Sequence, residues 1–323
     1  MYQPPPPRYH HPDAPTVIRQ PGPLTPPPRP RRRAGWWLAG CFLLLCPLVI
    51  ITGLIGGVFL AAWQSGQLNV LILGQDRRPG ETGPIRTDTL ILAAFDPQQP
   101  QAAILSIPRD LWVDIPGQGS NRINTAHYFG ELTQPGYGPE LAKQTVQNNF
   151  GLTLHGYILV DFTGFVALVD ALGGIEVDVP ETIVDENYPT DDYGYTTIVI
   201  PAGPQHMDGA TALIYARTRH TDSDFGRSQR QQQVLRALVT RVAQPGAWPR
   251  LPAAWAAART YLTTDLNEVD LATMLLAVLL VGPEGLQSRS INQEMTIPFT
   301  TDLGAQVLLP RWEVILPLVN QLF

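Results

Sequence analysis

The longest apolar stretch of the sequence covers residues 34–75 and contains no charged residue. Within it, residues 36–63 are rich in Leu, Ile, Val and Phe, and tryptophans stand at both ends. A segment of roughly 20 apolar residues is long enough to cross a bilayer, and aromatic side chains are typical of its two interfaces. No clear small-residue cleavage site follows, so we expect residues 34–63 to form one uncleaved transmembrane signal-anchor helix.

The segment before this helix has no hydrophobic periodicity. Residues 1–33 contain 12 of the 32 prolines and end in Arg31, Arg32 and Arg33. A proline-rich segment without hydrophobic periodicity is typical of a disordered, partly polyproline II tail. An arginine cluster beside a membrane helix favours the cytoplasmic side. We therefore expect residues 1–33 to be a cytoplasmic tail and residues 67–323 to form one domain outside the membrane.

The outer part of the chain alternates between two apolar patterns. Short runs rich in branched apolar residues predict strands at 68–73, 88–95, 101–107, 111–115, 156–160, 175–179, 289–299 and 305–309. Longer segments of helical periodicity predict helices at 138–150, 162–171, 208–217, 225–243, 251–261, 267–280 and 310–322. Residues 185–195 are polar and Tyr-rich, which indicates a loop or a hairpin. Interleaved strands and helices predict the α/β class, an α-β-α sandwich around a central mixed sheet.

The order of the first three strands makes a specific prediction about side chains. If they form an antiparallel meander, Asp76 lies just past the end of the first strand, Asp88 starts the second, and Arg109 follows the third. These positions return to the same edge of a sheet. We therefore expect the two carboxylates and the arginine to converge there.

The amino-acid composition excludes several classes of protein. Apolar residues make up 44% of the chain, which is too many for a disordered protein. Both cysteines lie inside the apolar stretch, which excludes a disulfide framework and a cysteine zinc site. The net charge of −6 gives no support for nucleic-acid binding. The six histidines are scattered, and no nucleophile or nucleotide-binding motif occurs.

Two carboxylates brought together outside a membrane suit a hard divalent cation. Asp76 and Asp88 supply this pair. Mg²⁺ takes one or two carboxylates and completes its shell with phosphate oxygens and water. Mg²⁺ is therefore the expected ion, with Mn²⁺ as a second choice. The alternative is a turn aspartate and a strand-capping aspartate without a metal.

The densest polar signal lies around the predicted helix 225–243. Arg227, Arg230 and Gln231 stand at positions i, i+3 and i+4, which places them on one helix face close to the N-terminus. Arginine forks bind phosphate oxygens in pairs, and a helix N-terminus adds positive charge. This pattern favours phosphate binding over a solvated charged face. Arg109, taken alone, is also compatible with a surface ion pair to Asp110, and the signal from Arg122 is weaker still.

Seven motifs in order carry a family resemblance: GQDRR, RTDT, SIPRD, NRINTAHYFG, LVDALGG, DGATALIYARTR and DFGRSQRQQQ. Together they resemble the LytR-CpsA-Psr family of bacterial cell-envelope enzymes. The likeness covers about residues 68–243 in detail and extends more loosely to the end. Arg122 stands where the family often has lysine, so that position keeps its charge with a different geometry.

The resemblance implies an activity. Members of the family move a glycopolymer from an undecaprenyl-pyrophosphate carrier to peptidoglycan, forming a phosphodiester at a sugar hydroxyl and releasing the lipid monophosphate. The donor and acceptor would then be that lipid-linked polymer and peptidoglycan. The protein would sit in the bacterial cytoplasmic membrane as a single-pass protein, with its N-terminus inside and its catalytic domain outside.

The resemblance also implies roles for single residues. Asp76 and Asp88 would hold Mg²⁺, and Asp224 would organise the arginines; with Arg86 and Arg109 they form the expected catalytic set. The residues expected to bind the pyrophosphate are Arg86, Arg109, Arg122, Arg217, Arg219, Arg227, Arg230 and Gln231. The lipid tail would lie in a hydrophobic pocket.

Three points stay open at the level of sequence. A hydrolase that releases the polymer phosphate to water, and a non-catalytic envelope-binding or regulatory protein, are alternatives to the transferase. The general base is one of Asp88, Asp110 and Asp224. The apolar segment 157–174 fits either sheet-facing core or the wall of a lipid tunnel.

Overall fold

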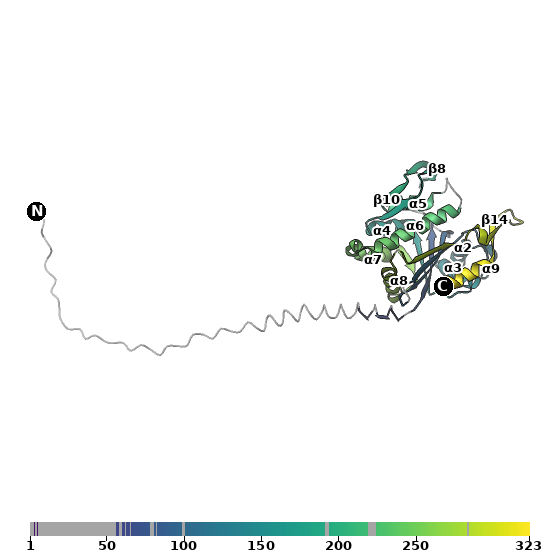
Figure 1. The fold of residues 1–323 in the computed structure, drawn as a ribbon, viewed down its shortest axis with the longest axis horizontal. Coiled ribbons are helices and arrows are strands. Elements are labelled where there is room, and N and C mark those ends of the chain that lie inside the picture. The colour runs from purple at the N-terminus through teal and green to yellow at the C-terminus, as the bar shows by residue number, and fades with distance from the viewer. Residues whose placement is uncertain are drawn as a thin grey trace. The chain divides into compact units, whose positions relative to one another are not determined.

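The computed structural model describes residues 66–323 apart from 78–80, 82, 99–100, 191–193, 219–223 and 283, together with residues 3, 5, 56, 57, 60, 61, 63 and 64. The predicted tail and most of the predicted anchor lie outside the described residues. Among those residues, no helix is both long enough and apolar enough to span a membrane. All elements described below belong to the unit Gly53–Phe323 (Figure 1).

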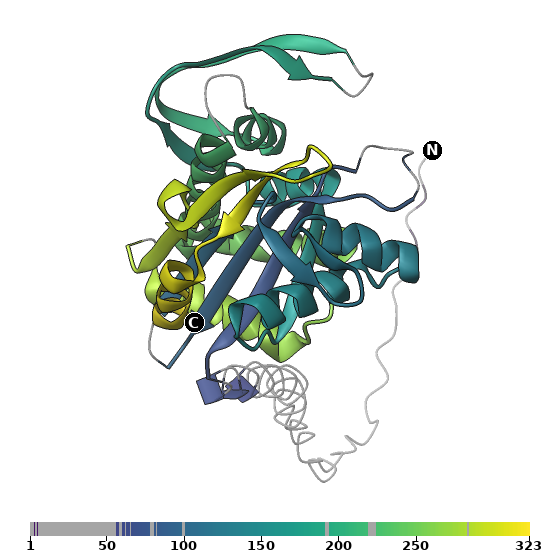
Figure 2. The same ribbon diagram turned by 90° about the vertical axis from the view of Figure 1, so that its right-hand side faces the viewer.

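A six-stranded mixed sheet forms the centre of this unit (Figures 1 and 2). Its strands, in spatial order, are β11 (Leu262–Thr264), β6 (Gly156–Asp161), β1 (Leu68–Gln75), β2 (Thr87–Asp96), β3 (Gln101–Ile107) and β12 (Leu286–Ser290). Strands β1, β2 and β3 form the predicted antiparallel meander. The pairs β1–β6 and β3–β12 are parallel, so the predicted mixed sheet is confirmed.

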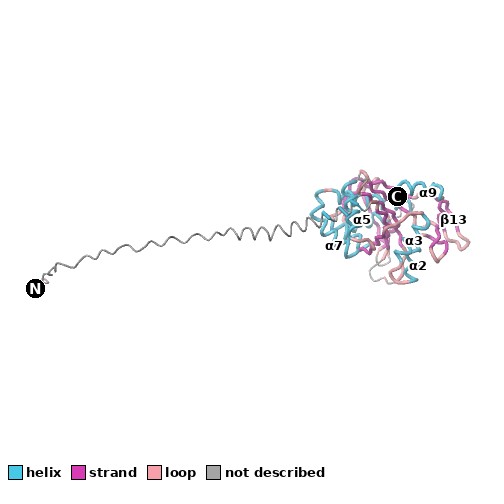
Figure 3. The backbone as a smooth tube through the Cα atoms, turned by 90° about the horizontal axis from the view of Figure 1, so that it is seen from below, coloured by secondary structure: helices cyan, strands magenta, loops and turns pink. Residues whose placement is uncertain are grey.

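Helices cover both faces of the sheet. Leu71, Leu73, Leu90 and Leu92 pack with α2 (Thr125–Thr133), α3 (Gly138–Phe150) and α9 (Trp312–Leu322) in one core cluster. On the opposite face, a second cluster joins β2 and β3 to α6 (Asp224–Ala243) and α8 (Glu268–Val281). Figure 3 shows α2, α3 and α9 on one side of the strands and α5 and α7 on the other. The predicted three-layer sandwich is confirmed, and burial on both faces explains why these strands read as continuous apolar runs.

A smaller core lies beside the central sheet. It joins α4 (Phe162–Ala171), α5 (Gly209–Arg217) and α6 to two antiparallel pairs of strands. These pairs are β7 (Ile175–Val179) with β10 (Gly203–Met207), and β8 (Ile183–Pro189) with β9 (Tyr195–Ile200). Strands β8 and β9 include both ends of the polar segment and pair antiparallel, which selects the hairpin of the two options, and Figure 2 shows these strands at the top of the view.

The C-terminal part differs from the prediction in one place. The expected strand at 289–299 is two strands, β12 and β13 (Thr296–Thr300), separated by the 3-10 turn Gln293–Met295. The Asn292 side chain caps this turn by accepting from the Glu294 N–H, which stops the strand. Strand β13 then pairs with β14 (Gln306–Pro310). Helix α7 (Leu251–Tyr261) agrees with its prediction.

Several short elements were not predicted. They are α2, β5 (Gly119–Arg122), which pairs with β4 (Trp112–Ile115), and the strands β10 and β11. Helix α2 buries Thr125, Ala126, His127 and Gly130, which are too polar or too small to give an apolar period. Such elements form because they pack against the surrounding core, and intrinsic propensity does not predict this packing.

Candidate functional site

The meander brings the first three predicted residues to one edge of the sheet. Asp76 follows the last residue of β1, Asp88 is the second residue of β2, and Arg109 stands two residues after β3. The Arg109 Nη1 atom donates to the Asp88 Oδ1 atom at 2.9 Å. All three side chains line one cavity, so the predicted convergence is confirmed.

A glycine allows the end of β1 to approach β2 closely. The pairing register of these strands shifts between Gly74 and Gln75, opposite Thr89 and Thr87. A Cβ atom added to Gly74 would lie 2.9 Å from the Thr89 Cβ atom. Only glycine fits here without displacement, and this irregularity immediately precedes Asp76.

Arg217 fixes the first carboxylate from another part of the chain. It is the last residue of α5, and its Nη2 atom donates to the Asp76 Oδ2 atom at 3.2 Å. Its Nη1 atom donates to the Tyr188 hydroxyl at 3.3 Å, and its guanidinium carbon lies 4.1 Å from the centre of the Phe162 ring. A planar guanidinium stacked on an aromatic face is held in orientation as well as in position.

Helix α6 contributes two residues from the predicted face. Arg227 and Gln231 line the same cavity as Asp76 and Asp88. Arg227 is buried, with a residue exposure of 6%. The helical spacing thus identified two side chains that the structure brings together with the carboxylates.

Three of the predicted phosphate-binding residues lie away from this cavity. Arg230 is buried behind it and donates to the Thr218 carbonyl. Arg122 pairs with Asp110 at 3.2 Å and donates to the Gln306 carbonyl. Arg86 is exposed and does not line either cavity described below. The structure therefore places Arg230 and Arg122 as supports of neighbouring backbone.

Two further predicted site residues, Arg219 and Asp224, lie wholly or partly outside the described residues. Arg219 lies outside the described residues. Asp224 is the first residue of α6, but its side chain also lies outside the described part. Their implied roles stay predictions.

Sequence reasoning missed several residues of the site. Asp185, Asn187, Pro189 and Tyr195 of the β8–β9 hairpin line the cavity. Asp185 is 2% exposed and accepts from the Thr218 hydroxyl at 2.6 Å, directly after Arg217 in the chain. The Tyr-rich composition of the segment was the available signal, but nothing in it indicated a return to Arg217.

The segment that leads into β2 is held by a buried histidine. The His127 Nδ1 atom lies 2.9 Å from the Ile85 carbonyl, and the Thr87 N–H donates to the Asn124 carbonyl. His127 is 1% exposed, and burial lowers its pKa below the usual value against the opposing effect of the Ile85 carbonyl. A neutral imidazole under this segment helps to position Asp88.

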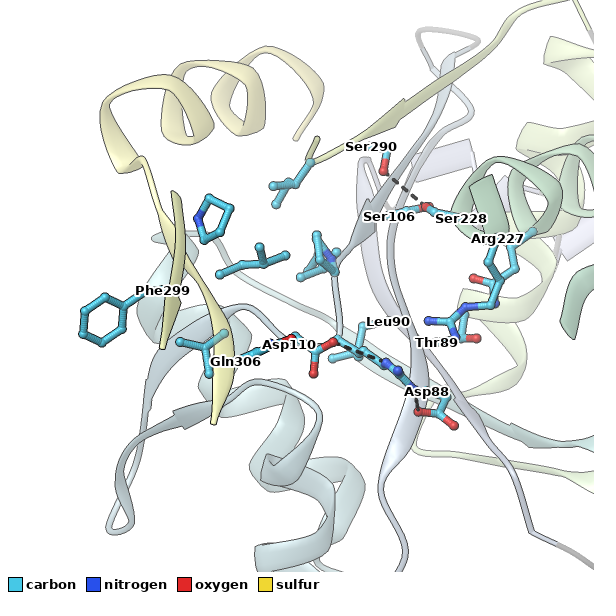
Figure 4. A pocket seen from close by; sticks show the side chains of 18 of the residues that line it. Asp88, Thr89, Leu90, Ser106, Asp110, Arg227, Ser228, Ser290, Phe299 and Gln306 are labelled. Atoms are coloured by element: carbon cyan, nitrogen blue, oxygen red, sulfur yellow. Dashed lines mark hydrogen bonds and ion pairs between the residues drawn. The ribbon is translucent and has the colours of Figure 1, made fainter. Parts of the chain in front are cut away.

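Two cavities of about 510 Å³ each meet at the site. The first, which we call the apolar cavity, carries the two carboxylates at one end. Its apolar lining includes Ile72, Ile91, Val160, Phe162, Phe165, Leu213, Val234 and Leu235. The second, which we call the serine cavity, is lined by Ser106, Ser228 and Ser290 among others and is drawn in Figure 4. Asp88, Thr89, Arg109, Arg227 and Gln231 line both and form a shared wall.

The oxygens at the end of β1 suit a divalent cation. The Asp76 Oδ1 and Gln75 Oε1 atoms are buried and accept no hydrogen bond in the described part of the chain. Buried oxygens without a donor are costly, and a cation would satisfy them. No group of three His, Cys, Asp or Glu gathers among the described residues. Two carboxylates are nevertheless sufficient for Mg²⁺ when phosphate oxygens supply other ligands, so the residues present fit this ion.

The fold and the site together define an α/β protein suited to bind an amphiphilic anion, with arginines and carboxylates at one end of an apolar cavity. The model of the LytR_cpsA_psr family matches residues 60–307, and the chain belongs to this family. The resemblance found in the motifs is thereby confirmed.

The chain is also similar to individual named proteins. The chain is similar to the polyisoprenyl-teichoic acid–peptidoglycan teichoic acid transferase TagU of Oceanobacillus iheyensis, with 33% identity over 76% of this chain and 81% of TagU. It is also similar to the regulatory protein MsrR of Staphylococcus aureus, with 31% identity over 70% of this chain and 64% of MsrR. The solved structure of TagT bound to LI-WTA superposes with a TM-score of 0.64 at 25% identity, covering 80% of this chain and 90% of TagT.

Proposed function

We propose that this protein transfers a glycopolymer from an undecaprenyl-pyrophosphate carrier to peptidoglycan and forms a phosphodiester at a sugar hydroxyl. The observation that carries the proposal is the placement of two carboxylates and three arginines at one end of an apolar cavity. A lipid-linked pyrophosphate has the same division into a charged head and an apolar tail. The names of TagU and of TagT bound to LI-WTA support the proposal.

The arginines account for binding of the charged head. Arg109, Arg217 and Arg227 reach the cavity from three different elements, so they surround its polar end. Arginine forks bind phosphate oxygens in pairs, and fixed positive charges stabilise the negative charge that spreads over the transferred group. Phosphoryl transfer needs such positioning more than it needs a covalent nucleophile. This requirement explains why the sequence lacks the usual nucleophile motifs.

The two carboxylates are the proposed ligands of a divalent ion. In the proposed enzyme, Asp76 and Asp88 hold Mg²⁺, or Mn²⁺ as a substitute. The bound ion would neutralise charge on the pyrophosphate oxygens. Arg217 and Arg109 each pair with one of these carboxylates, so they hold the ligands in place before the substrate arrives.

The apolar cavity is the proposed binding site of the lipid chain. Phe162 and Phe165 come from the segment 157–174, which sequence reasoning left open between core and lipid wall. Val169 of the same helix is fully buried in the smaller core. The segment therefore serves both purposes, since one face packs inward and another lines the cavity. In the proposed enzyme, the lipid chain lies along Phe162, Phe165 and Leu213.

A lipid-linked donor also requires the membrane. We propose that residues 34–63 anchor the protein in the bacterial cytoplasmic membrane, with the N-terminal tail inside and the domain outside. The support is the uncharged apolar stretch and the arginine cluster before it. Cysteine accessibility to a membrane-impermeant reagent would test this, with one cysteine introduced at residue 20 and another at residue 303. Labelling of the first and not the second in intact cells would contradict the orientation.

The activity is testable with the full-length protein. The reaction contains a lipid-pyrophosphate-linked oligosaccharide, Mg²⁺ and a peptidoglycan oligomer, and mass spectrometry detects the phosphodiester adduct. We expect an adduct that is lost with EDTA, with Asp76→Ala and with Arg109→Ala. The exposed Ser120→Leu variant is a matched control, because Ser120 lines neither cavity.

Two other outcomes would contradict transfer. Lipid monophosphate that forms at the same rate without any adduct, across several acceptors, would identify a hydrolase. The name of MsrR favours a second candidate, a regulatory or binding role. Tight binding of the lipid without any turnover would support that role instead.

A further inference from the structure

The two cavities at the site extend from their shared wall over different strands of the central sheet. The apolar cavity is lined by Ile72 of β1 and Val160 of β6. The serine cavity is lined by Ile107 of β3 and Ser290 of β12. In the order of the sheet, β1 and β6 lie on one side of β2, and β3 and β12 lie on the other. The cavities therefore approach the shared wall from two directions.

The linings of the two cavities differ in chemistry. In the serine cavity, Ser228 comes from α6 and Ser290 from the end of β12, with their Oγ atoms 3.2 Å apart. Ser106 is paired with Ser290 in the sheet, and Asp110 and Gln306 lie at the other side (Figure 4). Pro108, Pro298 and Val307 supply an apolar floor. Hydroxyl groups around an apolar floor complement a sugar ring, which has polar edges and C–H faces.

We propose that the serine cavity binds a carbohydrate, the sugar that carries the acceptor hydroxyl. This proposal rests on the transferase function above and assigns a place to its second substrate. The lipid-linked donor occupies the apolar cavity, because aromatic and aliphatic side chains dominate there. The acceptor enters from the side of β3 and β12, and the two substrates meet at Asp88, Arg109 and Arg227.

This arrangement fits the geometry of phosphoryl transfer. In an in-line displacement the attacking and leaving oxygens lie on opposite sides of the phosphorus atom. The acceptor hydroxyl oxygen bonds to the phosphorus that carries the glycopolymer. The bond from this phosphorus to the bridging oxygen breaks, and its electron pair leaves with the lipid monophosphate. The hydroxyl proton passes to the Asp110 carboxylate of the serine cavity, and the product is a phosphodiester.

The test separates the acceptor from the donor. Ser228→Leu and Ser290→Leu place a larger apolar side chain in the serine cavity, and Ser120→Leu is the matched surface control. Transfer by the full-length protein is measured against varied peptidoglycan tetrasaccharide and, separately, against varied lipid-linked oligosaccharide. We expect the KM for the tetrasaccharide to rise about tenfold in both cavity variants, the size expected for one or two lost hydrogen bonds to a sugar. The KM for the donor should change less than the KM for the acceptor.

A binding measurement makes the result independent of turnover. Saturation-transfer NMR compares two probes, the peptidoglycan tetrasaccharide and the free oligosaccharide cut from the donor. Loss of tetrasaccharide signal in both cavity variants, with the signal kept in Ser120→Leu, supports the proposal even if no transfer is observed. Loss of only the donor oligosaccharide signal would overturn it, because the cavity would then hold the donor glycan. Unchanged signals for both probes would overturn it as well.

Discussion

Arg217 offers the sharpest test of how the site works. Lysine at this position keeps the positive charge but replaces the planar fork with a single ammonium group. In the structure the fork donates to both the Asp76 carboxylate and the Tyr188 hydroxyl, and its plane lies over the Phe162 ring. Arg217→Lys therefore removes the second hydrogen bond and the ring contact while it leaves the charge in place.

The size of the effect follows from these contacts. A hydrogen bond to a charged group contributes about 1.5–3 kcal/mol, and a partly exposed cation–π contact about 0.5–1 kcal/mol. The hydrogen bond from Arg217 to the Tyr188 hydroxyl is long at 3.3 Å, which favours the lower half of the combined range. A loss of about 2 kcal/mol corresponds to about a 30-fold lower kcat/KM.

The assay is transfer from a lipid-linked donor at limiting concentration, which reports kcat/KM directly. Arg289→Lys is the control, because Arg289 is exposed and lines neither cavity. Urea unfolding of each variant separates a folding defect from a defect of the site. If Arg217→Lys stays within about threefold of the unaltered protein while Arg217→Ala loses activity, charge alone accounts for the role of Arg217 and the orientation argument is refuted.

Three further changes test other parts of the structure. Because burial lowers the pKa of His127, the unfolded chain takes up a proton near pH 6.5 that the folded chain rejects. The contribution of His127 to the free energy of unfolding is therefore fully present above this pH and is lost as the pH drops toward the folded-state pKa. His127→Gln should flatten this pH dependence, as measured by urea unfolding at several pH values. Gly74→Ala should destabilise the protein by about 1–3 kcal/mol through the close Thr89 contact, as judged by urea unfolding, and an unchanged midpoint would refute the packing argument. Leu213→Trp should raise the donor KM about tenfold by filling the apolar cavity, and a change confined to the acceptor KM would reverse the assignment of the cavities.

The part of the site that sequence could predict is the part set by strand ends. Asp76, Asp88 and Arg109 each adjoin a buried apolar run, and an antiparallel meander has few ways to arrange such ends. Helical spacing identified Arg227 and Gln231 for a similar reason, since positions i and i+4 share a face. Local periodicity was sufficient in both cases.

The rest depended on contacts between distant segments. Tyr188 and Asp185 reach the site because a hairpin folds back over α5, and no pattern within residues 183–200 records that partner. Contacts with distant segments also explain why two predicted arginines do not line the apolar cavity. Arg230 shares a helix face with Arg227 but turns toward the Thr218 carbonyl, and Arg122 finds Asp110 and the Gln306 carbonyl. Charge and spacing predict which surface of an element a side chain lies on, but its role depends on the residue that it contacts from another part of the chain.

The apolar cavity also changes the environment that the proposed donor meets. Its lining includes Ile72, Phe165 and Leu235, and the carboxylates Asp76 and Asp88 line the same cavity. In the proposed enzyme, a pyrophosphate bound at these carboxylates keeps the adjoining part of its hydrocarbon chain against this lining. That part of the chain then exchanges one apolar environment for another instead of entering water, so its transfer carries little hydrophobic cost.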